Sequence, residues 1–397
     1  MTISAKKICY PTQAAVAEAS CVSQETVSHI LGAGAKGRCY SAKTRERVFE
    51  VAKRLGYRPQ PHARTLRSGR SHIIGAVCHS GIYHASQERV RHLTRCAIRS
   101  GYRIVSVDLG WFDGDVASAQ DYLFGAITEG IIFCNISAAC QTSWKNFIEE
   151  YSLPVVSMNG ALDFGDLALV DMRSAFRDMT LHHMEQGSRQ LHLLLSYHDT
   201  PRGEHLMRNQ KARAEGFVDA ILSVGGVVNA DRELCQVLGL PFPVRQDAAI
   251  QGHIHSPKRI ELYEDVVDMG YFEAKRLLQS ERCQPDSLIC SNDHIAAGAI
   301  AACGEVGIRI PEAVRVSGSD NDPVSRYRGV QLTTIEQPAQ LMAEWSVHRM
   351  VKQIETPKEE RESSQKEFFP CELIIRSSTV PDPVPVHLTT TKSKNHL

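Results

Sequence analysis

The chain has 397 residues, of which 43% are hydrophobic, and its 45 Lys and Arg residues balance 45 Asp and Glu residues. This length accommodates a small module of about seventy residues and two further domains of roughly 150 residues each. No run of about 18 apolar residues occurs and the first residues lack the apolar centre of a signal peptide, so we expect a cytoplasmic protein with no membrane span. The twelve cysteines are scattered and form no Cys-x-x-Cys pair, which favours buried, reduced thiols over disulfides.

Residues 13–32 carry the pattern of two short helices joined by a tight turn. Thr12 stands where it would cap the first helix, and Ser23 where it would cap the second. The second helix has apolar residues at helical spacing, which we expect to be buried: Val27, Ile30 and Leu31. A helix-turn-helix presents the outward polar positions of this helix to base edges in the major groove, and here they are Gln24, Glu25, Ser28 and His29. A helical bundle that binds no nucleic acid is the alternative.

A third helix is predicted over residues 44–55, with Ser41 as its N-cap and Gly56 at its end. Its apolar face consists of Val48, Val51, Ala52 and Leu55. Two prolines then break helical structure, and residues 62–66 have the length of one more turn before a linker rich in Gly and Arg.

The charge of the chain is unevenly distributed. Residues 1–70 hold thirteen Lys and Arg against four Asp and Glu, a net charge of +9, so the rest of the chain carries −9. A basic end on a neutral chain predicts that only this end meets a polyanion, because neutralisation of phosphates drives binding to nucleic acids. A solvated basic face without a partner is the alternative.

Four motifs follow one another in this basic region: Thr26-Val27-Ser28, Thr44-Arg45-Glu46-Arg47-Val48, Leu55-Gly56-Tyr57-Arg58-Pro59 and Ala63-Arg64-Thr65-Leu66-Arg67-Ser68-Gly69. Together they closely resemble the N-terminal region of the lactose repressor and galactose repressor family of transcriptional regulators. The resemblance implies a helix-turn-helix domain in residues 1–58 and a hinge helix with a linker in residues 59–71. It also implies DNA contacts by Gln24, Glu25, Thr26, Ser28, His29, Arg64 and Leu66, with Leu66 as the wedge that parts a central base step in the minor groove.

The sequence departs from the family at four places in this region. Ser20-Cys21 replaces the usual Ala-Gly of the turn, so a cysteine stands where glycine supplies a permissive backbone. His29 replaces a common arginine, and residues 32–40 form a longer loop than usual. Glu25 would repel phosphate, and we therefore expect it to accept a hydrogen bond from cytosine N4.

From residue 72 onward, apolar strand-like runs alternate with amphipathic helical segments, which predicts parallel sheets covered on both faces. The predicted strands are residues 72–78, 102–108, 130–135, 154–158, 167–171, 191–196, 286–291 and 313–319. The predicted helices are residues 86–100, 144–151, 174–186, 210–224 and 293–306. These strands are too many for one sheet, so we expect two doubly wound lobes with a cleft between them where strand ends meet.

The second region also resembles the same family, so the resemblance covers residues 12–379. Its motifs are Asp171, Lys211-Ala212-Arg213-Ala214-Glu215-Gly216-Phe217, Ser291-Asn292-Asp293-His294-Ile295-Ala296-Ala297-Gly298-Ala299, Ile310-Pro311, Val316-Ser317-Gly318-Ser319-Asp320-Asn321, Leu332-Thr333-Thr334-Ile335 and Leu373-Ile374-Ile375-Arg376-Ser377-Ser378-Thr379. The family folds like periplasmic sugar-binding proteins of type I, with lobes linked by three crossings. Here the crossings are expected near residues 172, 336 and 367. Lobe one would then comprise residues 72–171 and 337–360, and lobe two residues 172–336 and 367–379. The charged run 352–367 is interpreted as a solvated linker and residues 380–397 as a disordered tail.

The resemblance places three ligand-binding residues in the cleft: Arg213, Asn292 and Asp320. Their chemistry suits a polyol, because a carboxylate accepts paired hydroxyl groups, a guanidinium donates a rigid fork and an amide does both. Two aromatic residues in neighbouring loops, Tyr83 and Trp111, are candidates for the walls of the site. Asp293 is expected to cap the helix that follows it. The alternative for Arg213 is an ion pair with Glu215 or Asp219.

The sequence lacks the motifs that other classes of function require. The sequence has no G-x-S-x-G elbow and no phosphate loop, so we expect no enzyme. His182-His183 and His253-Ile254-His255 have no third ligand at suitable spacing, so we expect no metal, and no cofactor is implied. A free periplasmic binding protein would not carry the basic N-terminal module.

The resulting hypothesis is a homodimeric, ligand-responsive transcriptional regulator that binds a double-stranded DNA operator and a small-molecule effector. The resemblance to the family implies that it acts as a repressor. Ligand closure of the cleft would rotate the lobes and change the spacing of the hinges over residues 61–68. A carbohydrate is the expected effector, although nucleosides and purines are read by the same triad. The alternative hypothesis is a sugar-binding or sensing protein whose N-terminal module contacts protein.

Overall fold

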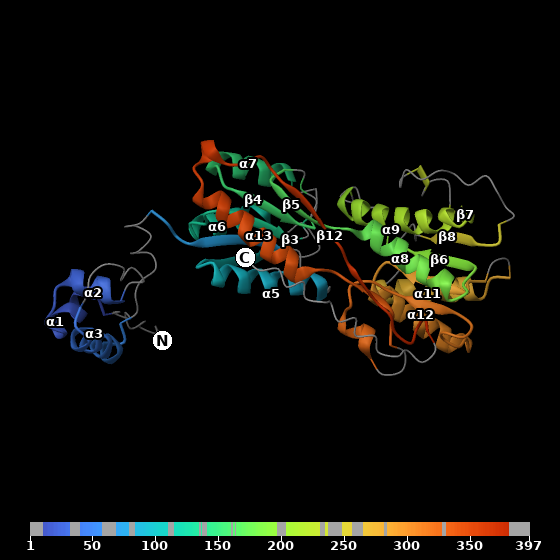
Figure 1. The fold of residues 1–397 in the computed structure, drawn as a ribbon, viewed down its shortest axis with the longest axis horizontal. Helices are drawn as coiled ribbons and strands as arrows, with labels where there is room; N and C mark the ends of the chain where they lie inside the picture. Colours follow the sequence, from blue (N-terminus) through green and yellow to red (C-terminus); the bar gives the residue numbers. More distant parts are fainter. Residues whose placement is uncertain are drawn as a thin grey trace, which may run out of the picture. The chain divides into compact units, whose positions relative to one another are not determined.

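The structure is a computed structural model, and it describes residues 11–31, 40–57, 69–78, 84–109, 115–134, 136, 141–159, 162, 164–196, 204–230, 235–236, 248–255, 265–281, 284–327 and 331–380. The chain forms two units, Met1–Ser71 and His72–Leu397, each of which is described by itself (Figure 1). No described helix is long and apolar enough to cross a membrane.

The first unit contains the three predicted helices: α1 (Gln13–Ala19), α2 (Gln24–Leu31) and α3 (Ala42–Leu55). Thr12 caps α1 and Ser41 caps α3, and Gly56 ends α3 in the left-handed conformation, so these predictions are confirmed. A small apolar core joins the helices and consists of Val16, Ala17, Val27, Ile30, Val48, Val51 and Ala52, with Leu31 packed against it. Leu55 differs from the prediction, because it is exposed rather than part of the buried face.

The second unit contains two parallel sheets. The first sheet has the strand order β12-β5-β4-β3-β1-β2. Its strands are β1 (Ile73–Cys78), β2 (Arg103–Asp108), β3 (Ile131–Cys134), β4 (Val155–Met158), β5 (Asp166–Val170) and β12 (Lys366–Phe369). One face packs against α5 (His84–Arg99) and α13 (Ala339–Glu355), and the other against α6 (Val116–Gly125) and α7 (Gln141–Tyr151). We call this sheet and these four helices lobe one.

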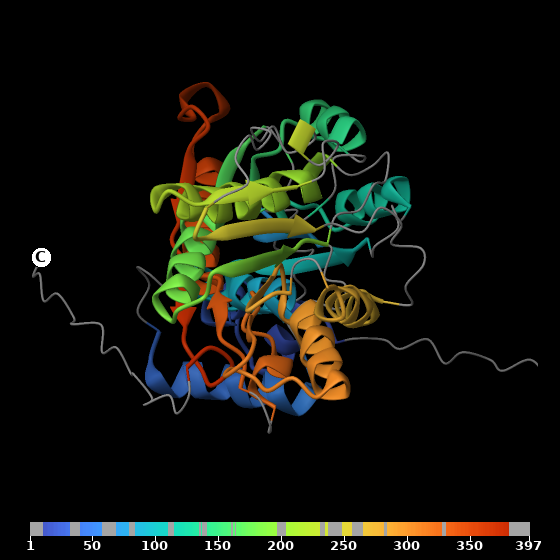
Figure 2. The ribbon, with the colours of Figure 1, turned by 90° about the vertical axis from the view of Figure 1, so that its right-hand side faces the viewer.

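The second sheet has the order β10-β9-β6-β8-β7. Its strands are β6 (Gln190–Leu194), β7 (Val227–Asn229), β8 (Gln251–His255), β9 (Ser287–Cys290) and β10 (Arg315–Ser317). Figure 2 shows these strands side by side with helices around them. Leu191 and Leu193 pack with α8 (Met172–Glu185) and α9 (Glu204–Ser223), whereas Leu194 and Leu288 pack with α11 (Val266–Leu278) and α12 (Asp293–Val306). The doubly wound arrangement is therefore confirmed for both sheets.

A short antiparallel pair, β11 (Thr334–Glu336) and β13 (Glu372–Ile374), lies beside the second sheet, because Ser317 of β10 bridges to Thr333. We call this pair, the second sheet, its helices and the 3-10 turn η3 (Pro323–Arg326) lobe two. A second 3-10 turn, η4 (Lys358–Glu360), follows α13. Several elements were not predicted from the sequence: strands β7, β8, β11, β12 and β13 and helices α6, α11 and α13.

The chain passes between the lobes three times. The crossings are residue 171 between β5 and α8, residues 337–338 between β11 and α13, and residues 370–371 between β12 and β13. We call these residues and the side chains that meet there the lobe junction. The third crossing was expected near residue 367, and the structure corrects this: β12 pairs with β5 in the first sheet, so residues 366–369 belong to lobe one. The buried side chain of Phe369 fixes this strand in the core of lobe one.

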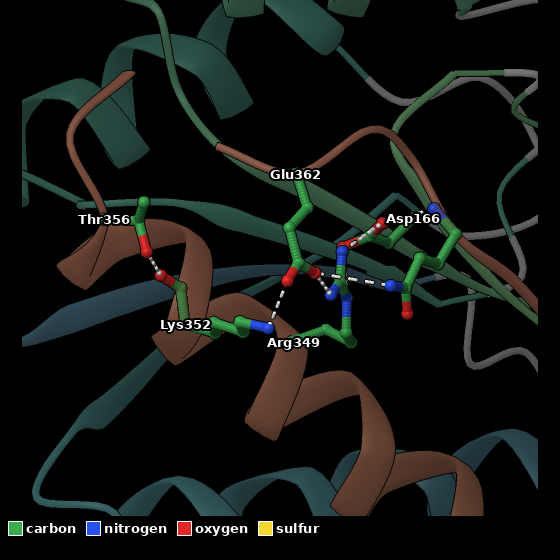
Figure 3. A network of polar contacts seen from close by, with 6 residues as sticks. Asp166, Arg349, Lys352, Thr356 and Glu362 are labelled. Atoms are coloured by element: carbon green, nitrogen blue, oxygen red, sulfur yellow. Dashed lines mark hydrogen bonds and ion pairs between the residues drawn. The ribbon is translucent and has the colours of Figure 1, made fainter. Parts of the chain in front are cut away.

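The charged run 352–367 is not a solvated linker, because an ion-pair network includes it (Figure 3). Arg349 of α13 is buried and binds Asp166 at the start of β5 in two places, Nε to Oδ2 at 2.9 Å and Nη2 to Oδ1 at 3.1 Å. Arg349 Nη1 also donates to Glu362 at 2.7 Å, and the backbone N–H of Gln365 donates to Asp166 at 2.7 Å. These contacts hold the segment that leads into β12 against β5.

Candidate functional site

The turn between α1 and α2 has a helix-turn-helix geometry with a cysteine in the left-handed region. Cys21 has φ +51° and an exposed side chain. The preceding Ser20 is fully buried, and its hydroxyl donates to the carbonyl of Val16 at 2.5 Å. The N–H of Val22 donates to the carbonyl of Ala17 at 3.1 Å. Cysteine therefore adopts the backbone conformation for which glycine is the usual residue.

The residues predicted to read DNA differ in how freely they face outward. Gln24 and Glu25 in the first turn of α2 are exposed, and Ser28 is partly buried. Thr26 belongs to the cap of the helix: its N–H donates to Ser23 Oγ at 3.1 Å and its hydroxyl lies 2.9 Å from the same atom. The helix thus begins at a serine cap, as predicted, and presents Gln24 and Glu25 beside it.

His29 lies against Tyr40 at the start of the segment that leads into α3. The two rings meet edge to face with 6.5 Å between centroids, and the Tyr40 hydroxyl lies 3.4 Å from His29 Nδ1. His29 is partly buried in this contact rather than fully exposed as the sequence suggested. The other two predicted DNA contacts, Arg64 and Leu66, lie outside the described residues, as does the long loop except for Tyr40.

Asp320 lies at the lobe junction, after the carboxyl end of β10. Its backbone is in a strained region, with φ +108°, and its N–H donates to the carbonyl of Ile335 at 2.8 Å. Its carboxylate accepts a hydrogen bond from the side-chain amide of Gln337, the first residue of the second crossing. Burial raises the pKa of Asp320, and the nearby Arg213 opposes that shift. Asp320 is therefore held among cations at the point where ligands bind in open parallel sheets.

Arg213 reaches the same place from α9. Its side chain is buried, with 8% exposed, and its guanidinium lies 5.5 Å from the centroid of the Phe176 ring. Glu215 and Asp219, the alternative partners, instead bind Arg173, with distances of 3.4 Å and 2.6 Å. The structure thus brings Arg213 and Asp320 together, as the sequence analysis expected.

Asn292 occupies the N-cap position of α12 that was expected of Asp293. Asn292 caps α12, because its Oδ1 accepts the N–H of Ile295 at 2.8 Å. The expectation that Asp293 caps the helix is therefore wrong. Asp293 is fully buried and accepts hydrogen bonds from the N–H of Asp322 at 2.7 Å and the hydroxyl of Thr334 at 2.6 Å. Burial also raises the pKa of Asp293 well above its usual value.

Arg89 on α5 is a candidate that the sequence analysis missed. Its side chain is 2% exposed, and Nη2 donates a hydrogen bond to Oε1 of Gln337. Arg89 also lies within electrostatic range of Asp320, Arg213 and Cys134, the last residue of β3. A sequence signal exists, because Arg89 precedes the buried Leu93 by four residues and so stands on the apolar stripe of its helix.

Cys371 at the third crossing marks where these groups converge. Burial raises the pKa of its thiol to about 12, and Arg213, Asp320, Asp171 and Arg89 all act on it electrostatically. Side chains from both lobes and from the three crossings therefore surround one point at the junction. The two aromatic residues expected at this site, Tyr83 and Trp111, lie outside the described residues.

The paired histidines of the sequence have structural surroundings. His182 lies 2.9 Å from the Thr379 hydroxyl, and His183 lies 2.8 Å from Ser317 and 2.6 Å from Ser287. His253 and His255 stack with His192 on the second sheet. Within the described part of the chain, no three His, Cys, Asp or Glu side chains are grouped in a way that would hold a metal ion.

The chain is similar to known transcriptional regulators over nearly its whole length. It is 25% identical over 376 residues to the HTH-type transcriptional repressor PurR of Erwinia tasmaniensis, covering 93% of this chain and 96% of that protein. It is 26% identical over 366 residues to the PurR of Pasteurella multocida, covering 91% and 97%.

Solved structures share the fold. The lac repressor dimer bound to operator and the anti-inducer ONPF aligns with a TM-score of 0.69 and 20% identity, covering 94% of this chain and all of that one. The complex of the transcriptional regulator CelR with cellobiose aligns with a TM-score of 0.58 and 19% identity, covering 93% and 99%. Residues 180–379, half of the chain, match the model of the periplasmic binding protein-like domain. The chain belongs to the periplasmic binding protein-like family, and its similarity to transcriptional repressors over nearly its whole length agrees with the resemblance of its motifs to the lactose repressor and galactose repressor family.

Proposed function

We propose that this protein is a ligand-responsive, sequence-specific transcriptional regulator, a repressor, whose N-terminal unit binds an operator in double-stranded DNA. One observation carries the proposal: a helix-turn-helix unit with exposed Gln24 and Glu25 precedes a two-lobed unit whose three crossings bring polar side chains from both lobes together. The curated relatives are named transcriptional repressors. A regulator of this kind is a cytoplasmic homodimer, not an enzyme, and it needs no cofactor.

The DNA-reading half of the proposal assigns residues 1–58 to the helix-turn-helix domain and residues 59–71 to the hinge helix and linker. Gln24, Glu25, Ser28 and His29 would contact base edges in the major groove, with Thr26 fixing the start of the helix. Arg64 and Leu66 would act in the minor groove, where Leu66 parts a base step. The net charge of +9 over residues 1–70 supports binding to phosphate.

The ligand-binding half assigns the effector to the lobe junction, within residues 72–379. Arg213, Asn292 and Asp320 would hold a small molecule, with Tyr83 and Trp111 as walls, and a carbohydrate is the class that their hydrogen-bonding groups suit best. The solved relative with cellobiose supports a sugar. A ligand that binds the two lobe arrangements with different affinity would shift the operator-binding equilibrium by that difference.

Selection of binding sites from a random DNA library by the full chain tests the DNA-reading half. We expect a near-palindromic operator, whose affinity falls steeply as salt is raised. Glu25→Ala should relax the preference at one base pair by about 1–3 kcal/mol, whereas Glu50→Ala, a removal of the same charge from the exposed face of α3, should not. Leu66→Ala should weaken operator binding more than nonspecific binding.

The alternative function, a sugar sensor whose N-terminal module contacts protein, leads to a different result. In that case neither a selected sequence nor a salt-dependent complex with DNA would be obtained. Equal losses of specific and nonspecific affinity in Leu66→Ala would remove the wedge assignment but leave the regulator in place.

A further inference from the structure

We propose that the effector carries an anionic group, a carboxylate or a phosphate, and that Arg89 and Arg213 bind this group together at the lobe junction. The inference rests on the proposed function and narrows its ligand class from polyols in general to anionic ones. Asp320 and Asn292 would hold the hydroxyl groups of the same molecule.

Arg89 is a buried cation that makes no ion pair with a carboxylate among the described residues. Its side chain is 2% exposed and its hydrogen bond goes to Gln337, a neutral amide. Its Nε atom is buried and makes no hydrogen bond to any described residue. Moving a guanidinium out of water is unfavourable unless charged or strongly polar partners offset the lost hydration. Among the described residues, Arg89 therefore has no anionic oxygen atom as a hydrogen-bond partner.

A second cation stands beside the first. Arg213 is buried against Phe176, and its charge acts unfavourably on Arg89. Both arginines interact with the same carboxylate, that of Asp320, which also accepts the Gln337 amide. The buried Nε of Arg89 is a donor that a further anion could use, and the guanidinium fork matches a carboxylate or phosphate bidentately.

The other acidic residues of the region have partners or are kept from ionising. Asp322 binds His294 at 2.9 Å, and burial raises the pKa of Asp293 well above its usual value. Asp171 accepts the N–H of Ser174 at 3.1 Å as the N-cap of α8, where the helix terminus and Arg173 offset its charge. None of these three carboxylates makes an ion pair with Arg89 within the described part of the chain.

The anion would also connect the two lobes. Arg89 belongs to lobe one, whereas Arg213, Asn292 and Asp320 belong to lobe two. A neutral sugar would leave the Arg89 donors unsatisfied, so the two ligand classes would differ in affinity as well as in how strongly they join the lobes. Hydrogen bonds to a charged group contribute about 1.5–3 kcal/mol, which corresponds to a preference of roughly 10- to 100-fold.

The test compares matched ligands that differ only in charge. Calorimetric titration of the full chain uses D-galacturonate against D-galactose, D-gluconate against sorbitol, and D-glucose 6-phosphate against D-glucose, with sodium chloride at matched ionic strength and inorganic phosphate as a bare anion. We expect the anionic member of at least one pair to bind about 10-fold or more tightly than its neutral partner. Galacturonate and gluconate carry a carboxylate and glucose 6-phosphate carries a phosphate, so the pair that shows this preference identifies the anionic group that is bound.

Variants of Arg89 establish which residue reads the charge. Arg89→Gln should lower the affinity for the anionic ligand more than the affinity for its neutral partner and so remove the preference for the anion, and Arg89→Lys should restore part of the preference. Arg91→Gln, on the exposed face of the same helix, is the matched control and should change nothing. Retained operator binding shows that each variant is folded.

Three results would overturn the inference. Equal binding of the charged and neutral members would reject the anionic ligand and keep the regulator. An anion preference that survives Arg89→Gln would reject the assigned residue. Arg89 would then only connect α5 to Gln337 of the second crossing, a structural contact that does not select among ligands. Binding of no compound, together with operator affinity that no compound alters, would go against the ligand-binding half of the proposed function itself.

Discussion

Arg89 and Gln337 are joined by a hydrogen bond from the guanidinium to the amide oxygen, although 248 positions separate them in the sequence. The amide nitrogen of Gln337 donates in turn to Asp320. An amide both donates and accepts, so Gln337 suits a position between a guanidinium and a carboxylate. One side chain at the second crossing thus connects a helix of lobe one with the acidic residue of lobe two.

Gln337→Ala should weaken effector binding by about 10-fold, because Arg89 and Asp320 lose the partner that orients them and each such hydrogen bond contributes about 1 kcal/mol. Calorimetric titration with the tightest-binding ligand of the matched pairs measures the change. Gln340→Ala, an amide removal at an exposed position two residues into α13, is the control. Unchanged affinity in Gln337→Ala would mean that the arginine and the carboxylate are oriented without it.

Cys21→Gly should stabilise the helix-turn-helix unit by about 1 kcal/mol, because a side chain in the left-handed region costs about 1–2 kcal/mol and glycine avoids this cost. The greater freedom of glycine in the unfolded chain offsets part of the gain. Hydrogen exchange of the backbone amides in α1 and α2 of the full chain measures the local effect, and thermal unfolding of the same protein measures the global one. Cys21→Ala retains the strained backbone and should give no gain, so equal stabilisation by both substitutions would attribute the effect to the thiol.

Arg349→Met should destabilise the second unit by roughly 3–5 kcal/mol, since it leaves Asp166 buried without its cation. Lys352→Met removes a neighbouring cation from the same network at an exposed position and should cost no more than about 1 kcal/mol. Urea unfolding monitored by circular dichroism compares the two. The double variant Arg349→Met with Asp166→Leu should recover much of the loss, and failure to recover would show that the network does more than neutralise Asp166.

Local signals in the sequence were sufficient for much of the fold. Ser23, Ser41 and Gly56 each mark a helix end within a few residues of the helix itself, and the structure has those ends. The strand β12 could not be predicted in this way. Lys366 and Glu367 are exposed and read as a charged linker, and the segment becomes a strand because β5, about two hundred positions earlier, offers a free edge.

In the candidate site, too, some residues could be predicted from sequence motifs, whereas others depend on long-range contacts. Arg213 and Asp320 follow from motifs of the family, and the structure brings them together. Arg89 and Gln337 belong to no such motif, and their role depends on contacts between segments far apart in the chain. Asn292 and Asp293 are both suitable caps for α12, and the choice is decided by Thr334 and Asp322, which bind Asp293 from outside the helix. Local propensity alone could not distinguish them.

The stacked histidines of the second sheet should make the second unit less stable as pH falls. Burial lowers the pKa of His192 to about 2 and that of His255 to about 4, and Arg276 on α11 acts in the same direction on both. The unfolded chain binds protons at these residues near pH 6.5, whereas the folded chain does not. Stability is therefore complete above pH 6.5 and is lost as pH falls toward 4, with each residue contributing on the order of 1 kcal/mol by pH 5.

Urea unfolding of the wild type and of His255→Gln between pH 7.5 and pH 5 tests this dependence. Glutamine keeps a hydrogen-bonding group near His192, whose Nδ1 lies 2.9 Å from His255 Nε2, but it does not titrate. We expect the variant to lose less stability than the wild type over this range, and His348→Gln, at an exposed position, to behave as the wild type. Parallel pH profiles for all three proteins would show that the stacked histidines are solvated enough to take up protons in the folded state.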